Sequence, residues 1–493
     1  MIRPRGKLLK HLLLFVAYSV VGSLLTLLII FVFTLDARTD LDLWHLADLD
    51  AEFTADSDIK TFDQYLVLEE RLFAQLDEQV YAETGLPGDD VANRFKRGSL
   101  ADPERWPRNW NRSYEMTAED PQAAVLLLHG LSDSPYSLRS IAERMHAANA
   151  HVLGLRIPGH GTAPSGLVEV SWQDMAAAVA LAVNHLADTH PQKPIYIVGY
   201  SNGAALAVHY ALSGLEKPGS PKVERLVLIS PAIGVTKAAS IAVWQGRLGH
   251  FLGLEKLAWN SIEPEYDPFK YGSFAINAGD VSYRMTIQIQ RLLDKASVAK
   301  QLSLMPPIQA FSSVVDATVL APALIKNLLG RLPAGGHELV LYDVNSKAGL
   351  DYFYKWDPKE IFRTLKRAGV SSYALSMVSN RHDPGGKVIE RQWEEGGTDY
   401  NDTLLNLDWP SDVYSMSHVA LPFPPQDPLY GGMPSEPSPG VQLGSLVLRG
   451  ERDVLRISPA SMLRLRWNPF YAYQEQKMLR FLDLADATDP LRN

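Results

Sequence analysis

Residues 194–212 read PIYIVGYSNGAALAVHYAL, and within this stretch a strand pattern, a turn and a helix pattern follow one another. The first five residues are apolar and β-rich, which is typical of a short buried strand. Ala204–Leu212 is mostly small and apolar and favours a tightly packed helix. Between them, Ser201 is flanked by Gly199 and Gly203, which gives the G-x-S-x-G signature of a nucleophile elbow. We therefore predict that Ser201 is a nucleophile.

The composition of the chain limits the kinds of protein and of functional site that it can form. At 493 residues the chain is too long for one compact core, so we expect a main domain with substantial additions. The net charge is −9 and no basic cluster occurs outside the N-terminus, which argues against nucleic acid as a partner. The chain has no cysteine, and this excludes disulfides, thiolate catalysis and cysteine zinc sites together.

The N-terminus carries a long apolar run. Leu12–Phe33 contains no charged residue and would span about 33 Å as a helix, enough for the core of a bilayer. Basic residues precede it and acidic residues follow, so the positive-inside rule predicts a cytoplasmic tail at residues 1–11. The sequence Thr34–Ala37 is a poor cleavage site. We expect an uncleaved, single-pass signal anchor at residues 12–33, with the catalytic domain on the periplasmic or extracytoplasmic side.

The main domain shows alternating strand and helix patterns, which predict a mostly parallel central sheet flanked by helices. Strand patterns occur at residues 123–128, 151–155, 194–198, 224–229, 308–316 and 338–343. Helix patterns occur at residues 136–148, 171–189, 204–212 and 471–484. We assign the core to residues 121–230 and 307–484, and we expect residues 380–440 to form extended loops.

Two further regions do not show this alternation of strand and helix patterns. Residues 34–120 include an amphipathic helix pattern at 62–81, and we expect a helical stalk or packing segment there. A substrate- or partner-binding arm is the alternative for this region. Residues 231–306 interrupt the core with helix patterns at 238–252 and 281–299 around an aromatic, proline-punctuated middle. We expect this insertion to form a helical cap over the strand ends.

A serine nucleophile needs an acid and a histidine base, which in this architecture follow it along the chain in that order. Asp316 ends a strand pattern, and the carboxyl ends of strands are where ligand chemistry collects in open α/β sheets. We predict that Asp316 is the acid. Asp343 also ends a strand pattern and stays as the alternative.

His418 is the predicted base, because it lies in a loop just after the β-like segment 412–415. His382, in a turn-like segment, remains the alternative, whereas His337 precedes a strand and so lies at the wrong end of the sheet. The predicted oxyanion donors are the backbone N–H groups of Asn202, after the nucleophile, and Leu131, after an early strand.

Four motifs together resemble the serine-hydrolase branch of the α/β-hydrolase superfamily. They are His129-Gly130-Leu131, the turn Arg156–Thr162, Trp172 and the elbow Gly199–Gly203. The nearest likeness is to the monoacylglycerol lipase, carboxylesterase and serine aminopeptidase group, over about residues 120–345. The resemblance implies an α/β-hydrolase fold with a cap, and acyl transfer to water through an acyl-enzyme on the elbow serine. In the family the histidine closely follows the last strand, near residues 343–349 here, where this chain has none.

We therefore expect a membrane-anchored serine hydrolase that cleaves a carboxylic ester through Ser201, Asp316 and His418. Its partners would be a small acyl ester, with lipids among the candidates, and the membrane. We expect neither a metal nor a cofactor. A peptidase or thioesterase using the same triad is the first alternative, and a non-catalytic binding module is the second. The oligomeric state stays open.

Overall fold

The computed structural model describes residues 5–85, 91–234, 254–316, 318, 320–347, 372–381, 387–446, 457 and 462–484. Its centre is a sheet with the strand order β1-β3-β2-β4-β5-β8-β9-β10-β11-β12. The strands are β1 (Tyr114–Met116), β2 (Ala123–Leu128), β3 (Ala150–Leu155), β4 (Ile195–Tyr200), β5 (Arg225–Ile229), β8 (Ile308–Ser313), β9 (Glu338–Tyr342), β10 (Ala374–Ser379), β11 (Lys387–Trp393) and β12 (Tyr400–Asp408).

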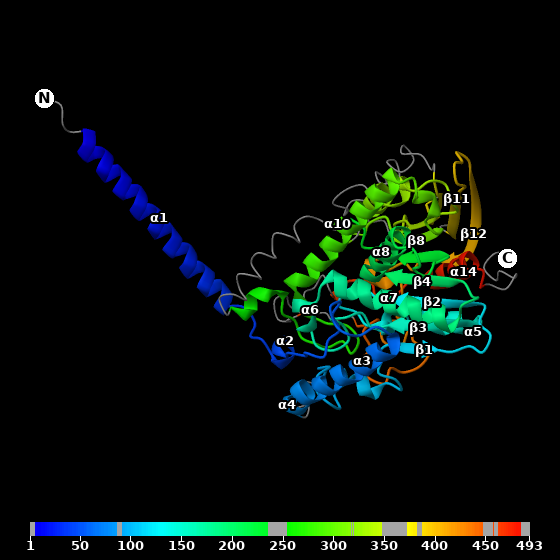
Figure 1. The fold of residues 1–493 in the computed structure, drawn as a ribbon, viewed down its shortest axis with the longest axis horizontal. Coiled ribbons are helices and arrows are strands. Elements are labelled where there is room, and N and C mark those ends of the chain that lie inside the picture. Colours follow the sequence, from blue (N-terminus) through cyan, green and yellow to red (C-terminus); the bar gives the residue numbers. More distant parts are fainter. Residues whose placement is uncertain are drawn as a thin grey trace.

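The sheet is parallel from β3 through β10 in spatial order, and antiparallel strands close both edges. The α-helices are α1 (Arg5–Asp36), α2 (Leu43–Leu46), α3 (Phe62–Leu76), α4 (Ala82–Thr84), α5 (Arg139–Ala147), α6 (Gly166–Glu169), α7 (Trp172–Thr189), α8 (Asn202–Glu216), α10 (Ile276–Val298), α11 (Ala321–Asn327) and α14 (Tyr471–Phe481). The predicted fold class, a mostly parallel sheet flanked by helices, is confirmed (Figure 1).

Helices cover both faces of the sheet, which explains why its central strands are continuously apolar. All six residues of β2 are buried. Leu126 and Leu128 point into a core shared with α7, α8 and α10, whereas Val125 and Leu127 point into a core shared with α5 and α14. Successive side chains of a strand point to opposite faces, so each strand contributes to both cores.

The far edge of the sheet corrects the expectation that residues 380–440 are extended loops. Residues 387–408 form the antiparallel pair β11 and β12, which continues the sheet beyond β10. Most side chains of β12 are exposed or half-buried, including Asn401 and Asp402. An edge strand with one wetted face keeps polar residues there, so it lacks the apolar run that marks a central strand.

The region before the sheet packs against it. The predicted helix at 62–81 is α3 followed by a π-helical turn at Asp77–Tyr81, and Thr61 caps it by accepting a hydrogen bond from the Gln64 amide. Phe53, Phe62 and Tyr65 are buried in the same core as α7 and α8. Much of residues 34–120 is thus bound to the main body through apolar contacts.

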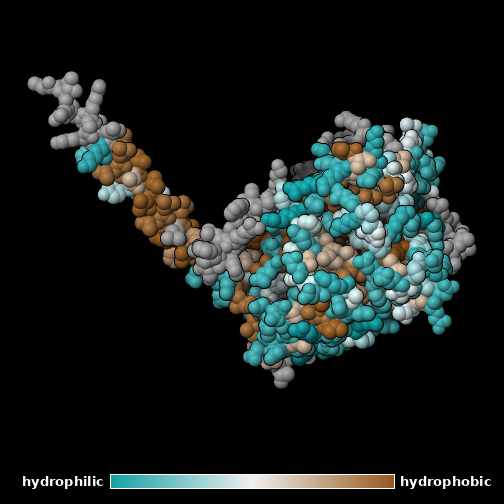
Figure 2. Space-filling model, in the orientation of Figure 1, coloured by the Kyte–Doolittle hydropathy of each residue, from teal (hydrophilic) through white to brown (hydrophobic). Residues whose placement is uncertain are grey.

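The N-terminal helix α1 is long and apolar, and it extends away from the body that holds the sheet (Figure 1). The part Lys10–Asp36 is long and apolar enough to cross a membrane, and the rest of the described chain does not bury its apolar stretch. Figure 2 shows its surface as largely hydrophobic, in contrast to the mixed surface of the main body. A signal sequence near the N-terminus has the same length and composition, so these two properties fit both an anchor and a signal sequence.

The described part of the insertion after β5 contains a short hairpin, β6 (Trp259–Ser261) and β7 (Phe274–Ala275), and the long helix α10. The predicted helix at 281–299 corresponds to α10, whereas the predicted helix at 238–252 lies outside the described residues. The chain after α1 is bound to this insertion, because Arg38 Nη1 donates to the Lys256 carbonyl (2.9 Å) and Lys256 Nζ donates to Asp40 Oδ1 (2.7 Å).

Short 3₁₀ turns connect several of these elements. They are Pro103–Arg105, Pro135–Leu138, Glu255–Ala258, Leu302–Leu304, Leu329–Arg331 and His418–Ala420.

Because His45 is buried, we expect the free energy of unfolding to depend on pH. Its Nε2 lies 2.9 Å from Ser273 Oγ in the insertion, and burial lowers its pKa from 6.5 to about 4. Between these two values the unfolded chain binds the proton and the folded chain does not, so stability falls as the pH falls. The full shift corresponds to about 3 kcal/mol. Between pH 7 and 4.5, the free energy of unfolding measured in urea should therefore fall less for His45→Gln than for wild type. An equal fall in the two proteins would contradict this prediction.

Candidate active site

The turn around Ser201 is the strained elbow that the sequence indicates. Ser201 has φ 54° and ψ −111°, a conformation that side-chain-bearing residues rarely adopt, and it directly precedes α8. Its amide donates to the Ile229 carbonyl at the end of β5 (2.9 Å). A Cβ on Gly203 would lie 2.1 Å from the Leu128 carbonyl oxygen, and one on Gly199 would lie 2.5 Å from Ala204 Cα. Only glycine fits at these two positions.

The structure brings Ser201, His418 and Asp316 together at the carboxyl ends of the parallel strands, which we call the carboxyl edge of the sheet. His418 Nε2 lies 3.1 Å from Ser201 Oγ, and His418 Nδ1 lies 3.0 Å from Asp316 Oδ2. All three residues are buried. The other carboxylate oxygen of Asp316 accepts a hydrogen bond from the Thr318 amide (2.8 Å), which fixes the plane of the carboxylate. These distances allow a proton to pass from the hydroxyl to the imidazole while the carboxylate orients the ring.

His418 lies at the carboxyl edge of the sheet, although a long segment separates it from β9 along the chain. Ser415 forms an isolated antiparallel bridge with Val344, which lies just after β9, and the Asn345 amide donates to the Tyr414 carbonyl (2.8 Å). The loop that carries His418 is therefore anchored beside the end of β9. That is where the family pattern expects the histidine, although β10, β11 and β12 intervene along the chain.

The alternative site residues lie elsewhere or have other partners. Asp343 Oδ2 accepts hydrogen bonds from Ser379 Oγ (2.8 Å) and Arg381 Nε (3.2 Å), which makes it one half of a partly buried ion pair. The Nδ1 atom of His337 accepts a hydrogen bond from the Ile308 amide, at the start of β8. His337 is thus at the opposite end of the sheet, as its position in the sequence predicts. His382 lies outside the described residues.

The two predicted oxyanion donors belong to different elements, the helix α8 and the loop after β2. Asn202 is the first residue of α8, and the amide of a first helical residue has no carbonyl partner within its own helix. Leu131 follows β2 and Gly130, and β2 lies directly beside β4 in the sheet. The loop continues through Ser132, which has φ 62° and whose carbonyl accepts a hydrogen bond from the Tyr271 amide (2.9 Å).

His129 and His160, which precede the nucleophile along the chain, have structural contacts. His129 is fully buried, and its Nε2 accepts a hydrogen bond from the Ile157 amide (3.0 Å). The Nδ1 of His160 lies 2.9 Å from the Pro158 carbonyl. Burial lowers the pKa of His160 to about 4 and holds that of His129 well below its usual value. Both rings are therefore neutral at pH 7.

Sequence reasoning missed an ion pair at this edge. Lys270 Nζ, in the insertion, lies 2.6 Å from Asp133 Oδ1, in the loop that carries Leu131. The partners are separated by 137 positions. No local spacing pattern signals such a pair, and only the placement of the insertion over the loop reveals it.

Comparisons with known proteins agree with this architecture. Residues 119–297 match the family model described as serine aminopeptidase, S33. A stretch of 135 residues is 27% identical to a thermostable monoacylglycerol lipase of Bacillus sp. (strain H-257), covering 27% of this chain and 51% of that protein. The chain thus spans about half the length of the curated relative that it matches.

Solved structures also resemble the chain. The monoacylglycerol lipase of Paleococcus ferrophilus aligns with a TM-score of 0.35 and 16% identity, over 47% of this chain and 89% of that one. A soluble variant of monoglyceride lipase from Saccharomyces cerevisiae aligns with a TM-score of 0.36 and 13% identity, over 47% and 82%.

The match at residues 119–297 covers the strands β2 to β5, the elbow and α10. The resemblance seen in the sequence is therefore confirmed. The chain has the fold of the α/β-hydrolase superfamily, and its residues 119–297 are similar to the family described as serine aminopeptidase, S33.

Proposed function

We propose that this protein is a membrane-anchored serine hydrolase that cleaves a carboxylic ester through Ser201, His418 and Asp316. The observation that carries the proposal is the pair of contacts made by His418, 3.1 Å to the serine hydroxyl and 3.0 Å to the aspartate. A base within hydrogen-bond reach of a nucleophile, itself oriented by a third group, is the arrangement that serine catalysis requires.

The reaction follows from these positions. His418 Nε2 removes the hydroxyl proton as Ser201 Oγ attacks the ester carbonyl, and the resulting oxyanion accepts hydrogen bonds from the amides of Leu131 and Asn202. The imidazolium then donates its proton to the leaving alcohol, which departs and leaves an acyl group on the serine. Water, deprotonated by the same imidazole, attacks this acyl-enzyme and releases the acid. Asp316 holds Nδ1 protonated and stabilises the imidazolium.

The proposed substrate class is an ester with an apolar acyl chain, acylglycerols among them. The curated relative is named a monoacylglycerol lipase. The helix α1 would hold the catalytic domain at a membrane, where such esters reside.

Amide hydrolysis is the second candidate, because the matching family model is described as a serine aminopeptidase. The same three side chains could cleave an amide or a thioester. Comparing turnover of p-nitrophenyl esters of increasing chain length with that of aminoacyl p-nitroanilides separates the two functions. Preference for the anilides would overturn the ester assignment.

Replacing the proposed acid should lower catalysis far more than replacing Asp343, another buried aspartate that follows a parallel strand. Asp316→Asn leaves the histidine in the wrong tautomer, so kcat on a p-nitrophenyl ester should fall by about 10⁴. Asp343→Asn weakens the ion pair with Arg381 and is the matched control. Its kcat per folded molecule should stay within about tenfold of wild type, since Asp343 has no contact with His418 in the described residues. Equal losses in the two variants would refute the assignment of Asp316.

We further propose that the catalytic domain lies outside the cytoplasm. Basic residues precede the apolar run of α1, and Asp36, Asp40 and Asp42 follow it, which is the charge asymmetry of a helix with its N-terminus inside. Protease added to intact cells, or to spheroplasts for a periplasmic domain, should therefore degrade the domain. Digestion only after the inner membrane is lysed would show the opposite topology.

A further inference from the structure

Arg156, at the start of the turn between β3 and α6, carries a fully buried charge that two glutamates from the N-terminal region neutralise. Its Nη1 and Nη2 atoms donate to Glu52 Oε2 (2.9 Å) and Oε1 (2.8 Å), a bidentate pair. Its Nε donates to Glu69 Oε2 (2.9 Å). Burial alone would lower the pKa of Arg156, but the carboxylates outweigh it and raise the pKa well above its usual value. The guanidinium is therefore charged and held in one orientation.

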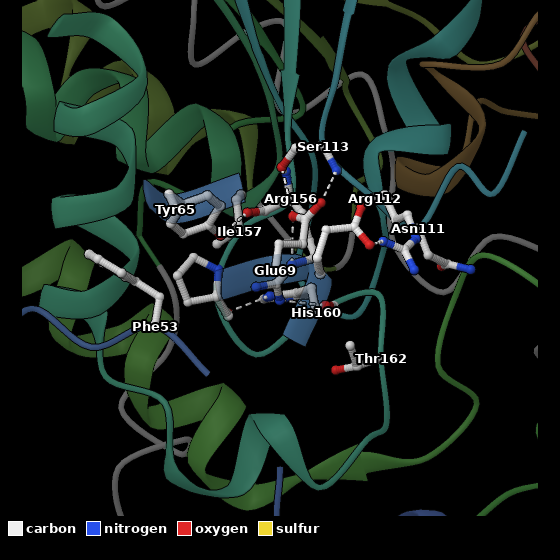
Figure 3. A network of polar contacts seen from close by, with 12 residues as sticks. Phe53, Tyr65, Glu69, Asn111, Arg112, Ser113, Arg156, Ile157, His160 and Thr162 are labelled. Carbon is white, nitrogen blue, oxygen red and sulfur yellow. Dashed lines mark hydrogen bonds and ion pairs between the residues drawn. The ribbon is translucent and has the colours of Figure 1, made fainter. Parts of the chain in front are cut away.

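The same glutamates also hold the backbone of neighbouring segments. Glu52 Oε2 accepts a further hydrogen bond from the Gly159 amide (2.8 Å), inside the turn that Arg156 begins. Glu69 accepts from Ser113 Oγ (2.8 Å), which in turn accepts from the Arg156 amide (2.9 Å). Figure 3 shows Glu69, Ser113 and Arg156 converging in this network. The turn at residues 156–161 is thus fixed from the N-terminal region.

This turn is joined to the proposed oxyanion loop through His129. The Ile157 amide can only donate, so His129 Nε2 must accept its hydrogen bond and the proton of the neutral ring lies on Nδ1. Nδ1 therefore donates to the Gly130 carbonyl, 2.9 Å away. The Gly130 carbonyl and the Leu131 N–H belong to one planar trans peptide, so the bond that fixes the carbonyl also fixes the direction of the N–H.

From this chain of contacts we infer that Glu52 is a positioning residue for the oxyanion hole, acting through the 156–161 turn and His129 on the Leu131 amide. The N-terminal region is then part of the catalytic apparatus in addition to a packing segment. This inference rests on the proposed function.

Glu52→Gln is the most direct test. Each carboxylate oxygen of Glu52 accepts from Arg156 and from one backbone amide, Phe53 at Oε1 and Gly159 at Oε2. The amide of glutamine has only one acceptor oxygen, so in either orientation its NH₂ group opposes an Arg156 N–H and one of these two backbone amides. With active sites counted by fluorophosphonate titration, kcat on a p-nitrophenyl ester should fall about ten- to hundredfold, less than the loss of a whole oxyanion donor, and KM should stay within about twofold. Glu70→Gln is the matched control, since Glu70 lies on α3 and pairs with Arg112 at the surface.

A transition-state analogue separates positioning from folding. Ser201 Oγ adds to the carbonyl carbon of a trifluoromethyl ketone, the proton passes to His418 and the charge settles on the former carbonyl oxygen, in the oxyanion hole. The Ki of this ketone should rise in Glu52→Gln by the same factor as kcat/KM falls. A purely structural role would lower the titratable fraction and Tm, yet leave kcat per titrated site and Ki equal to those of Glu70→Gln. That result would overturn the inference.

Glu52→Asp keeps the charge and both acceptor oxygens but shortens their reach by one methylene. It should lose kcat and ketone affinity in the same direction as Glu52→Gln, to a smaller extent. Unchanged values in folded Glu52→Asp would also overturn the inference, even if Glu52→Gln failed to fold. Failure of wild type to react with fluorophosphonate or ester would instead defeat the proposed function, so the two failures are distinguishable.

Discussion

The backbone of Ser201 is the constraint on which the site depends. Its positive φ turns the chain sharply between the end of β4 and the start of α8, and the conformation persists because the surroundings over-determine it. Gly199 and Gly203 let the helix and the neighbouring strand approach too closely for any side chain. The turn places the serine hydroxyl at the carboxyl edge of the sheet and the Asn202 amide beside it.

Parallel strands explain why residues far apart in the sequence meet at this edge. The segments that follow β2, β4 and β8 carry Leu131, Ser201 and Asp316, and the carboxyl ends of parallel strands share one edge. His418 joins them because its loop is bridged to Val344, just after β9. The partly buried ion pair of Lys270 with Asp133 joins the insertion to the loop that carries Leu131.

The local patterns of the sequence were sufficient for the elbow and for the parallel strands β2, β3, β4, β5, β8 and β9, because strands of a parallel sheet buried on both faces are apolar runs. The buried parallel strand β10 was not predicted. His418 could be selected from its place after a β-like segment, but its approach to Ser201 depends on a bridge that no local pattern encodes. The polar edge strand β12 was missed for lack of an apolar run. The contact of Glu52 with Arg156 joins residues 104 positions apart and likewise has no local signal.

The proposed mechanism requires that Ser201 forms an acyl-enzyme with an ester. The most direct measurement is the mass of the protein after rapid mixing with a p-nitrophenyl ester and an acid quench, followed by digestion and peptide mapping. We expect a burst of p-nitrophenol of about one equivalent per chain when deacylation is slower than acylation, and one acyl group on the peptide that contains Ser201. Ser201→Ala should show neither. An acyl group on another peptide, or equal labelling of Ser201→Ala, would rule out Ser201 as the nucleophile.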